Sequence, residues 1–349
     1  MKQEVKMNFS TIFFIDSYLE KQTDQKIFIK NFLSLLDSLK KESIPTFFLS
    51  RNQEITRDYS PLTFFYVASL QEQEQLLKRY SPENTVIVSD DSEFLDLCKT
   101  RGYSCTGFSH EKEFLPVTHC FEDFSSLSYK YLEYIYKRCQ NIPITITNTK
   151  ALLIREFSMT DMPQLFALYQ DEKNLQYMFQ REPDYALFCD KYSSYIEQIY
   201  PFYDYGLWAV ILKETGNVIG EFGLQHHRLD SKEEITLEYI LHPDFQRKGF
   251  ASQAIRAIFC YARDILSFNR IVAVIHPENQ ASIRVAKKCG MHFEKEILIH
   301  KKTFHLYAIF VQEERFFSEK DSSRQNTKEK VYQQYQQHPD TNVYGKRYN

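Results

Sequence analysis

Closely spaced cysteine pairs are missing from this sequence. It has seven cysteines, an odd number, and none of them form a C-x-x-C pair. A disulfide framework uses an even set of cysteines, and a structural zinc site usually draws on closely spaced ligands, so neither is expected. We predict reduced thiols and no metal site. The cysteines are Cys98, Cys105, Cys120, Cys139, Cys189, Cys260 and Cys289.

The sequence also lacks a long hydrophobic run. The apolar stretch Ile12–Ile15 near the N-terminus is far shorter than the roughly 20 residues that a membrane-spanning helix needs. It is also a poor match to a signal peptide. We therefore expect a cytoplasmic protein that does not bind membranes.

Neither sign of charge is in large excess. The chain has 43 Lys and Arg against 46 Asp and Glu, which gives a formal net charge of −3. Proteins that bind nucleic acids or anionic membrane surfaces usually carry an excess of basic residues, which attracts the negative charge of these partners. The balance argues against both classes, and it leaves a small molecule or another protein as the expected partner.

The chain is long and has ample apolar content. With 349 residues, 43% of them hydrophobic, it should form two cores. Pro143 disfavours helix for the residue before it, and the β-branched run Ile144–Thr147 opens a new element. We predict a first domain over residues 1–143, a second over 144–315, and a polar, disordered tail over 316–349.

Short apolar stretches alternate with helical patterns in the first domain. This alternation is typical of an α/β fold with a parallel sheet, so we predict a Rossmann-like layer. The expected strands are Thr11–Ile15, Thr46–Leu49, Leu62–Val67 and Thr85–Val88.

A strand, a short loop and a helix follow one another in the second domain. The strand is expected over Ile235–Leu241, and apolar residues recur at helical spacing from Ala251 onwards. Free backbone N–H groups at the start of such a helix favour a phosphate, and Arg247 and Lys248 add positive charge. Taken alone, the loop favours the simpler interpretation, an ordinary strand-to-helix turn that uses Gly249 for its geometry.

Three segments of the second domain carry a family resemblance. In chain order they read LLIREFSMTDMPQLFALY, HPDFQRKGFASQAI and VAVIHPENQASIRVAKKCGMHF, the last beginning within an expected strand, Arg270–Ile275. They resemble the GNAT N-acetyltransferases, in the branch that includes the ribosomal-protein N-terminal acetyltransferases. The resemblance covers Lys150–Gln312. The Q/R-x-x-G-x-G/A loop is moderately specific, and the downstream P-x-N-x-x-S pattern makes the combination specific.

The resemblance implies a mixed α+β domain with a bent sheet that splays after its fourth strand. Acetyl-CoA, the acyl donor, would enter there, pairing through its pantetheine with the main chain and placing its diphosphate on residues 246–252. Asn279 also suits a helix N-cap, and one residue can fill both roles. The residues that the resemblance assigns to acetyl-CoA are Tyr239, Leu241, Gln246, Arg247, Lys248, Gly249, Phe250, Ala251, Ser252, Asn279 and Ser282.

Two positions depart from the family's catalytic pattern. Thr236 stands at the usual strand glutamate, and Ala286 stands where many relatives carry a tyrosine that protonates the departing thiolate. Glu238 is the candidate general base, with a solvated strand-edge charge as its alternative. It shares a face with Thr236 in a regular strand, and a bulge would turn it to the opposite face. Glu221 and His226 are further candidates.

The first domain loosely resembles haloacid-dehalogenase-like phosphatases. Asp16 follows the first strand, Ser50 ends the second, and Asp90 and Asp91 follow another. Those enzymes place a second aspartate two residues after the nucleophile, where this chain has Tyr18, and no phosphate-binding lysine precedes Asp90. We predict a degenerate, non-catalytic module that serves as scaffold, partner surface or regulator.

Together these patterns predict an acetyl-CoA-dependent N-acetyltransferase in which a primary amine attacks the donor directly in a ternary complex. The acceptor would be a protein N-terminus or a small-molecule amine such as a polyamine, aminosugar or amino acid. The changes at Thr236 and Ala286 support an alternative, a weak or inactive acyl-CoA-binding regulatory module. A residual phosphatase activity of the first domain is a third hypothesis.

Overall fold

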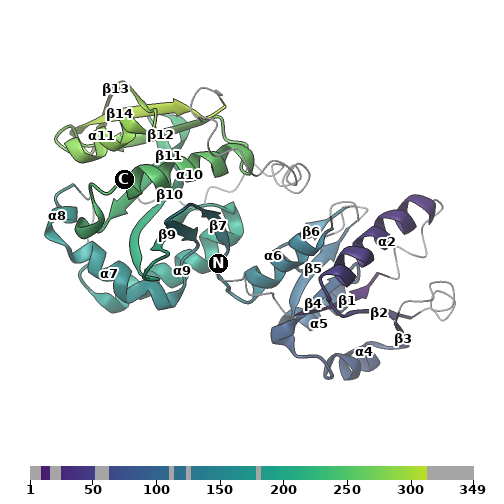
Figure 1. Ribbon diagram of the computed structural model, residues 1–349. Helices are drawn as coiled ribbons and strands as arrows, with labels where there is room; N and C mark the ends of the chain where they lie inside the picture. The colour runs from purple at the N-terminus through teal and green to yellow at the C-terminus, as the bar shows by residue number, and fades with distance from the viewer. Residues whose placement is uncertain are drawn as a thin grey trace. The chain divides into compact units, whose positions relative to one another are not determined.

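A computed structural model of the chain describes residues 9–15, 25–51, 63–109, 114–122, 127–177 and 182–312. The chain divides into two compact units, Met1–Ile144 and Thr145–Asn349 (Figure 1). Asp16, Tyr18 and the tail predicted over 316–349 lie outside the described residues.

The first unit contains a six-stranded sheet in which every neighbouring pair is parallel. The strand order is β3-β2-β1-β4-β5-β6. This confirms the predicted parallel α/β layer, whereas the likeness to haloacid-dehalogenase-like enzymes stays a prediction. The strands are β1 (Ser10–Phe14), β2 (Thr46–Ser50), β3 (Phe64–Tyr66), β4 (Thr85–Ser89), β5 (Ser104–Phe108) and β6 (Cys120–Phe121).

Both faces of this sheet are buried, as the apolar strands require. Alternate residues of β1 point to opposite faces, so Phe13 packs in one core with Phe32, and Ile12 and Phe14 pack in another with Phe94. The first core receives α2 (Gln25–Lys41) and α6 (Tyr129–Cys139), and the second receives α4 (Leu70–Leu77) and α5 (Ser92–Thr100). The short helix η1 (Pro82–Asn84) leads into β4.

The second unit contains an eight-stranded sheet in the order β13-β14-β12-β11-β10-β9-β8-β7. Among the described strands of this sheet, every neighbouring pair is antiparallel except β11 and β12. The strands are β7 (Thr145–Asn148), β8 (Leu152–Arg155), β9 (Leu207–Leu212), β10 (Val218–Leu229), β11 (Lys232–Leu241), β12 (Arg270–Ile275), β13 (His292–Ile299) and β14 (Lys302–Phe310).

The parallel pair β11 and β12 separates almost at once. The register joins only Thr236 to Val272, while β11 pairs with β10 along its whole length, from Lys232 to Leu241. The sheet therefore opens into a V on the carboxyl side of Thr236, as the family resemblance implied.

Helices cover both faces of the second sheet. Trp208 and Phe222 are opposite one another on β9 and β10 and so share a face; Trp208 meets Tyr261 of α10 there, with ring centroids 5.7 Å apart. α7 and α9 supply the side chains that meet Glu221, on the other face. The helices are η2 (Met159–Asp161), α7 (Met162–Gln170), α8 (Glu172–Leu175), α9 (Tyr185–Tyr203), η3 (Pro243–Phe245), α10 (Phe250–Asp264) and α11 (Gln280–Lys288).

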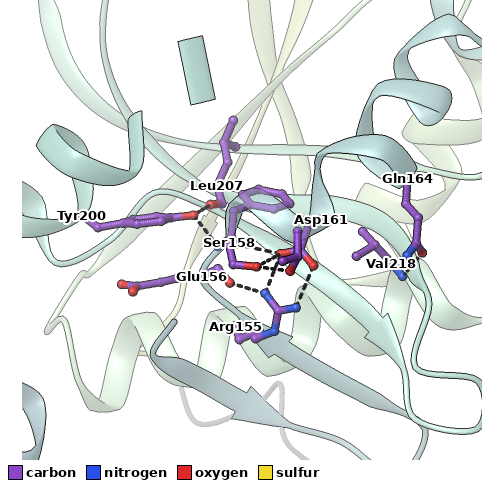
Figure 2. Close-up of polar contacts among 10 residues, drawn as sticks. Arg155, Glu156, Ser158, Asp161, Gln164, Tyr200, Leu207 and Val218 are labelled. Atoms are coloured by element: carbon purple, nitrogen blue, oxygen red, sulfur yellow. Dashed lines mark hydrogen bonds and ion pairs between the residues drawn. The ribbon is translucent and has the colours of Figure 1, made fainter. Parts of the chain in front are cut away.

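The buried hydroxyl of Tyr200 fixes α9 against the sheet. It accepts a hydrogen bond from the Phe157 amide (3.1 Å) and donates one to the Leu207 carbonyl. Figure 2 shows this contact beside a second anchor, where the guanidinium of Arg155 binds both oxygens of Asp161 at 2.7 and 2.8 Å. These bonds hold the end of β8, the start of α7 and the end of α9 in fixed relative positions.

No helix among the described residues combines the length and apolar character needed to cross a membrane. Within the same ranges, no group of three His, Cys, Asp or Glu side chains is placed to hold a metal ion. All seven cysteines are free thiols.

Candidate active site

Backbone polar groups of β11 face the opening between β11 and β12. The amide of His242 donates to the carbonyl of Ile219, near the start of β10 (2.8 Å). Because amide and carbonyl directions alternate along a strand, those of Tyr239 and Leu241 point the other way, toward β12. The Leu241 carbonyl accepts from the side-chain amide of Gln246 at 3.1 Å. Tyr239 thus presents its backbone to the opening, and Leu241 presents its amide.

The loop before α10 contains several backbone amides that donate no hydrogen bond to another described residue. Gly249 has a φ of 86° and Arg247 a φ of 60°, so the backbone turns sharply into the helix. No described residue accepts a hydrogen bond from the amides of residues 247–252, and the first turn of a helix leaves such donors free. A Cβ atom at Gly249 would meet nothing within 4 Å. The loop is therefore an open cradle of donors, suited to an anion.

The basic side chains of the loop border this cradle. Arg247 and Lys248 are exposed, and the Lys248 amine lies 5.3 Å from the ring centroid of Phe245. Phe250, Ala251 and Ser252 form the first turn of α10. Two positive charges beside a helix N-terminus favour a phosphorylated ligand.

Two residues assigned to acetyl-CoA by resemblance make contacts with a third. The Tyr239 hydroxyl donates to the Ser282 carbonyl at 3.1 Å, while its ring stacks on Phe222 with centroids 5.4 Å apart. The Asn279 carboxamide oxygen accepts the Ser282 amide at 3.0 Å. Asn279 therefore caps α11, as one of its two interpretations requires, and the Tyr239 side chain serves packing while its backbone faces the opening.

Glu238 lies on the same face of β11 as Thr236. The pairing of β10 with β11 has no register shift, so the bulge that would have turned Glu238 away is absent along this described pair. The Glu238 carboxylate lies 2.8 Å from Nε2 of His227, and its side chain is 45% exposed. His226, the histidine considered from the sequence, faces the other way and meets Glu233 at 3.3 Å. Strand alternation was the signal that could have favoured His227.

A second carboxylate, Glu221, is buried on the same face as Glu238. Glu221 pairs across the strands with Ile240, and Gly223 pairs with Glu238, so the two carboxylates stand diagonally on neighbouring strands. The Glu221 side chain is 3% exposed. It accepts hydrogen bonds from the hydroxyls of Tyr169 and Tyr192, the latter at 2.7 Å.

Burial raises the pKa of Glu221 to about 7, although both tyrosine hydrogen bonds pull it down. Burial also raises the pKa of Tyr169 and Tyr192, and the charge of Glu221 raises them further. Both tyrosines consequently remain hydroxyl donors at neutral pH. Phe188 packs between them, with ring centroids 5.7 Å from Tyr169 and 4.7 Å from Tyr192.

Gly223, opposite Glu238, admits no side chain. A Cβ atom there would lie 2.0 Å from the Gly206 carbonyl oxygen and 2.5 Å from the Leu207 Cα atom. The start of β9 therefore passes close over β10 at this point.

Comparisons with known proteins identify the family of the second unit. A family model described as "Acetyltransferase (GNAT) domain" matches residues 151–292. The N-acetyltransferase YnaD of Bacillus subtilis is 30% identical over 149 residues, which are 42% of this chain and 82% of YnaD. The chain belongs to the GNAT acetyltransferase family.

Two further similar proteins differ in how much of their length is matched. Protein YkkB of Bacillus subtilis is 32% identical over 105 residues, which are 30% of this chain and 61% of YkkB, so the match spans less than two thirds of YkkB. The crystal structure of a GNAT-family acetyltransferase from Bacillus anthracis aligns with a TM-score of 0.41 and 23% identity. That alignment covers 48% of this chain and 98% of the other.

GNAT enzymes use acetyl-CoA and act on amine acceptors, and this chain is an acetyltransferase of that family. Ala286 of α11 is fully buried, so the position at which the family resemblance led us to look for a tyrosine acid belongs here to the hydrophobic core.

Proposed function

We propose that the GNAT domain transfers an acetyl group from acetyl-CoA to a primary amine, by direct attack of the amine in a ternary complex. The acceptor is a protein N-terminus or a small-molecule amine. One observation carries the proposal: the opening beside Tyr239 and Leu241 lies between β11 and β12, and β11 leads directly into the free amides of residues 247–252.

The chemistry of these groups suits acetyl-CoA. The amides of residues 247–252, with Arg247 and Lys248, would hold the diphosphate. Main-chain groups of Tyr239 and Leu241 would pair with the amide-containing pantetheine, and Asn279 and Ser282 would lie beside it at the start of α11. Acetyl-CoA supplies an activated thioester, and a backbone N–H of β11 would stabilise the charge that develops on its carbonyl oxygen.

The acceptor must lose a proton before it can attack. A lysine-like amine titrates near 10.4, so its deprotonation at pH 7 is unfavourable by about 4–5 kcal/mol. Glu238 is the proposed general base. It is supported by its exposure, its place on the strand that borders the opening, and the 2.8 Å contact with His227 that orients it.

A second function is a regulatory module that binds acyl-CoA without efficient turnover. The side-chain changes favour it, because Thr236 replaces the usual carboxylate and Ala286 is buried. An acetyl-CoA turnover assay against a panel of amines, run beside cofactor-binding calorimetry, separates the two. Transfer to any amine supports the enzyme, and tight binding without transfer supports the module.

For the first unit we propose a scaffold or partner-binding role without phosphatase chemistry. Both carboxylate oxygens of Asp91 are engaged, one with the Phe94 amide at 2.8 Å and the other with Arg51 at 3.0 Å. Asp91 is thus used to cap α5. Magnesium-dependent hydrolysis of p-nitrophenyl phosphate should be absent, and hydrolysis that Asp16→Asn abolishes would overturn this proposal.

A further inference from the structure

Glu221 is a buried carboxylate that the proposed function does not use. It is 3% exposed, and a charged carboxylate is expensive to bury without a cation. Its two recorded hydrogen bonds come from neutral hydroxyls, those of Tyr169 and Tyr192. A buried carboxylate with a shifted pKa and no ion pair among the described residues is a candidate for a functional group.

The surroundings of Glu221 connect it to the acceptor side of the domain. Glu238 is on the same face of the sheet, diagonally across from it, and the charge of Glu238 raises the pKa of Glu221. Ala209 opposes Glu221 from β9. Besides Glu238, the titratable groups that interact with it are Tyr169 from α7 and Lys191, Tyr192, Tyr195 and Tyr200 from α9.

Of the two tyrosines, Tyr169 is the less buried. Its side chain is partly exposed, whereas Tyr192 is 6% exposed. Tyr169 also feels the charge of Glu238. A hydroxyl is both donor and acceptor, so it can receive one proton while it gives up another.

We infer that Glu221 serves the proposed acetyl transfer through Tyr169, whose hydroxyl receives a proton from the acceptor ammonium and passes its own proton to Glu221. The N–H bond of the ammonium breaks and the nitrogen keeps the electron pair. Tyr169 ends as a neutral hydroxyl and Glu221 as a neutral acid, which later releases its proton to solvent. The inference rests on the proposed function and adds to Glu238 a second, buried proton acceptor.

The acidity of Glu221 fits this task. With its pKa at about 7 in place of 4.5, Glu221 takes up a proton about 300-fold more readily than an ordinary glutamate, since each pKa unit is tenfold. A base with a pKa near the working pH is the most effective one. The hydrogen bonds from Tyr169 and Tyr192 lower that pKa, so removing either hydroxyl should raise the pKa of Glu221.

The test is the pH profile of kcat/KM for the best amine of the panel. In the wild-type enzyme we expect activity to fall as the pH drops below about 7, because protonated Glu221 cannot accept a proton. Glu221→Gln should remove this limb and lower kcat about 10- to 100-fold, with acetyl-CoA affinity unchanged. Tyr169→Phe should lower kcat similarly. Tyr192→Phe should keep the limb and move its midpoint to higher pH.

Controls separate chemistry from structure. Tyr185→Phe removes an exposed hydroxyl from the same helix as Tyr192 and should leave the profile in place. A limb near pH 7 that survives in Glu221→Gln but is lost in Glu238→Gln would overturn the inference while sparing the proposed function. Wild-type enzyme that binds acetyl-CoA yet acetylates no amine would overturn both. Should Glu221→Gln fail to fold, a midpoint that does not move in Tyr192→Phe would still contradict the inference.

Discussion

The hydroxyl of Tyr239, on β11, donates a hydrogen bond to the backbone carbonyl of Ser282, on α11, over 3.1 Å. α11 follows β12 in the chain. The bond therefore links β11 to the helix that follows β12, across the place where β11 and β12 separate. Tyr239→Phe keeps the ring stacked on Phe222 and removes only the bond. We expect the free energy of unfolding to fall by about 0.5–1.5 kcal/mol, measured by urea denaturation. An unchanged value would show that the bond does not hold the opening together.

Gly249→Asp should weaken acetyl-CoA binding by about 10- to 100-fold, because it adds a negative charge where the phosphate is proposed to bind. Calorimetry measures the effect. Gly216→Asp is the matched control, since Gly216 has a φ of 77° and also has no atom within 4 Å of its Cβ position. It introduces the same residue at similar backbone strain. Equal affinity in both variants would place the diphosphate elsewhere.

Glu238→Gln should reduce kcat by less than about 100-fold, which is below the range of about 10²–10⁴-fold for loss of an essential general base, because a solvent-linked water or a second acceptor can take the proton. Glu233→Gln serves as control, since Glu233 is also exposed on β11 but faces His226. Steady-state kinetics compares the two. A loss well beyond 100-fold in Glu238→Gln, with donor affinity intact, would make Glu238 the indispensable base.

The stability of the second unit should fall as the pH rises from about 4.5 to about 7. Glu221 titrates near 4.5 when unfolded and at about 7 when folded, so in this window the folded state binds more protons than the unfolded state. Its stabilising contribution is complete below pH 4.5 and is lost through pH 7, by about 3 kcal/mol. Chemical denaturation across this range should show a shallower fall in Glu221→Gln. An identical slope in both proteins would mean that Glu221 titrates normally.

Local elements were largely predictable from the sequence, because each is encoded within its own window. The strand expected over Arg270–Ile275 coincides with β12, and the helical spacing from Ala251 becomes α10. Of the strand expected over Leu62–Val67, the structure describes residues 63–67, and β3 spans Phe64–Tyr66. The loop at 246–252 was also predictable, since a glycine, two cations and a helix start adjoin in the chain.

The surroundings of the carboxylates were not predictable from the sequence. Tyr169 and Tyr192 precede Glu221 by 52 and 29 residues, and nothing in the local pattern indicates that two helices converge on one side chain. The choice between His226 and His227 depends on which face of β10 each residue takes. That is fixed by the register with β11, a long-range property.

The single bridge between Thr236 and Val272 has a mechanical consequence. β12, β13 and β14 form one hydrogen-bonded block, and β7 to β11 form another. With so little pairing between them, each block can open without first disrupting the ladders of the other. Acetyl-CoA bound in the V would pair like an extra strand and link the two blocks. The whole sheet would then open as one cooperative unit. Amide exchange in β12 and β14 should therefore slow on cofactor binding even at residues remote from the donor.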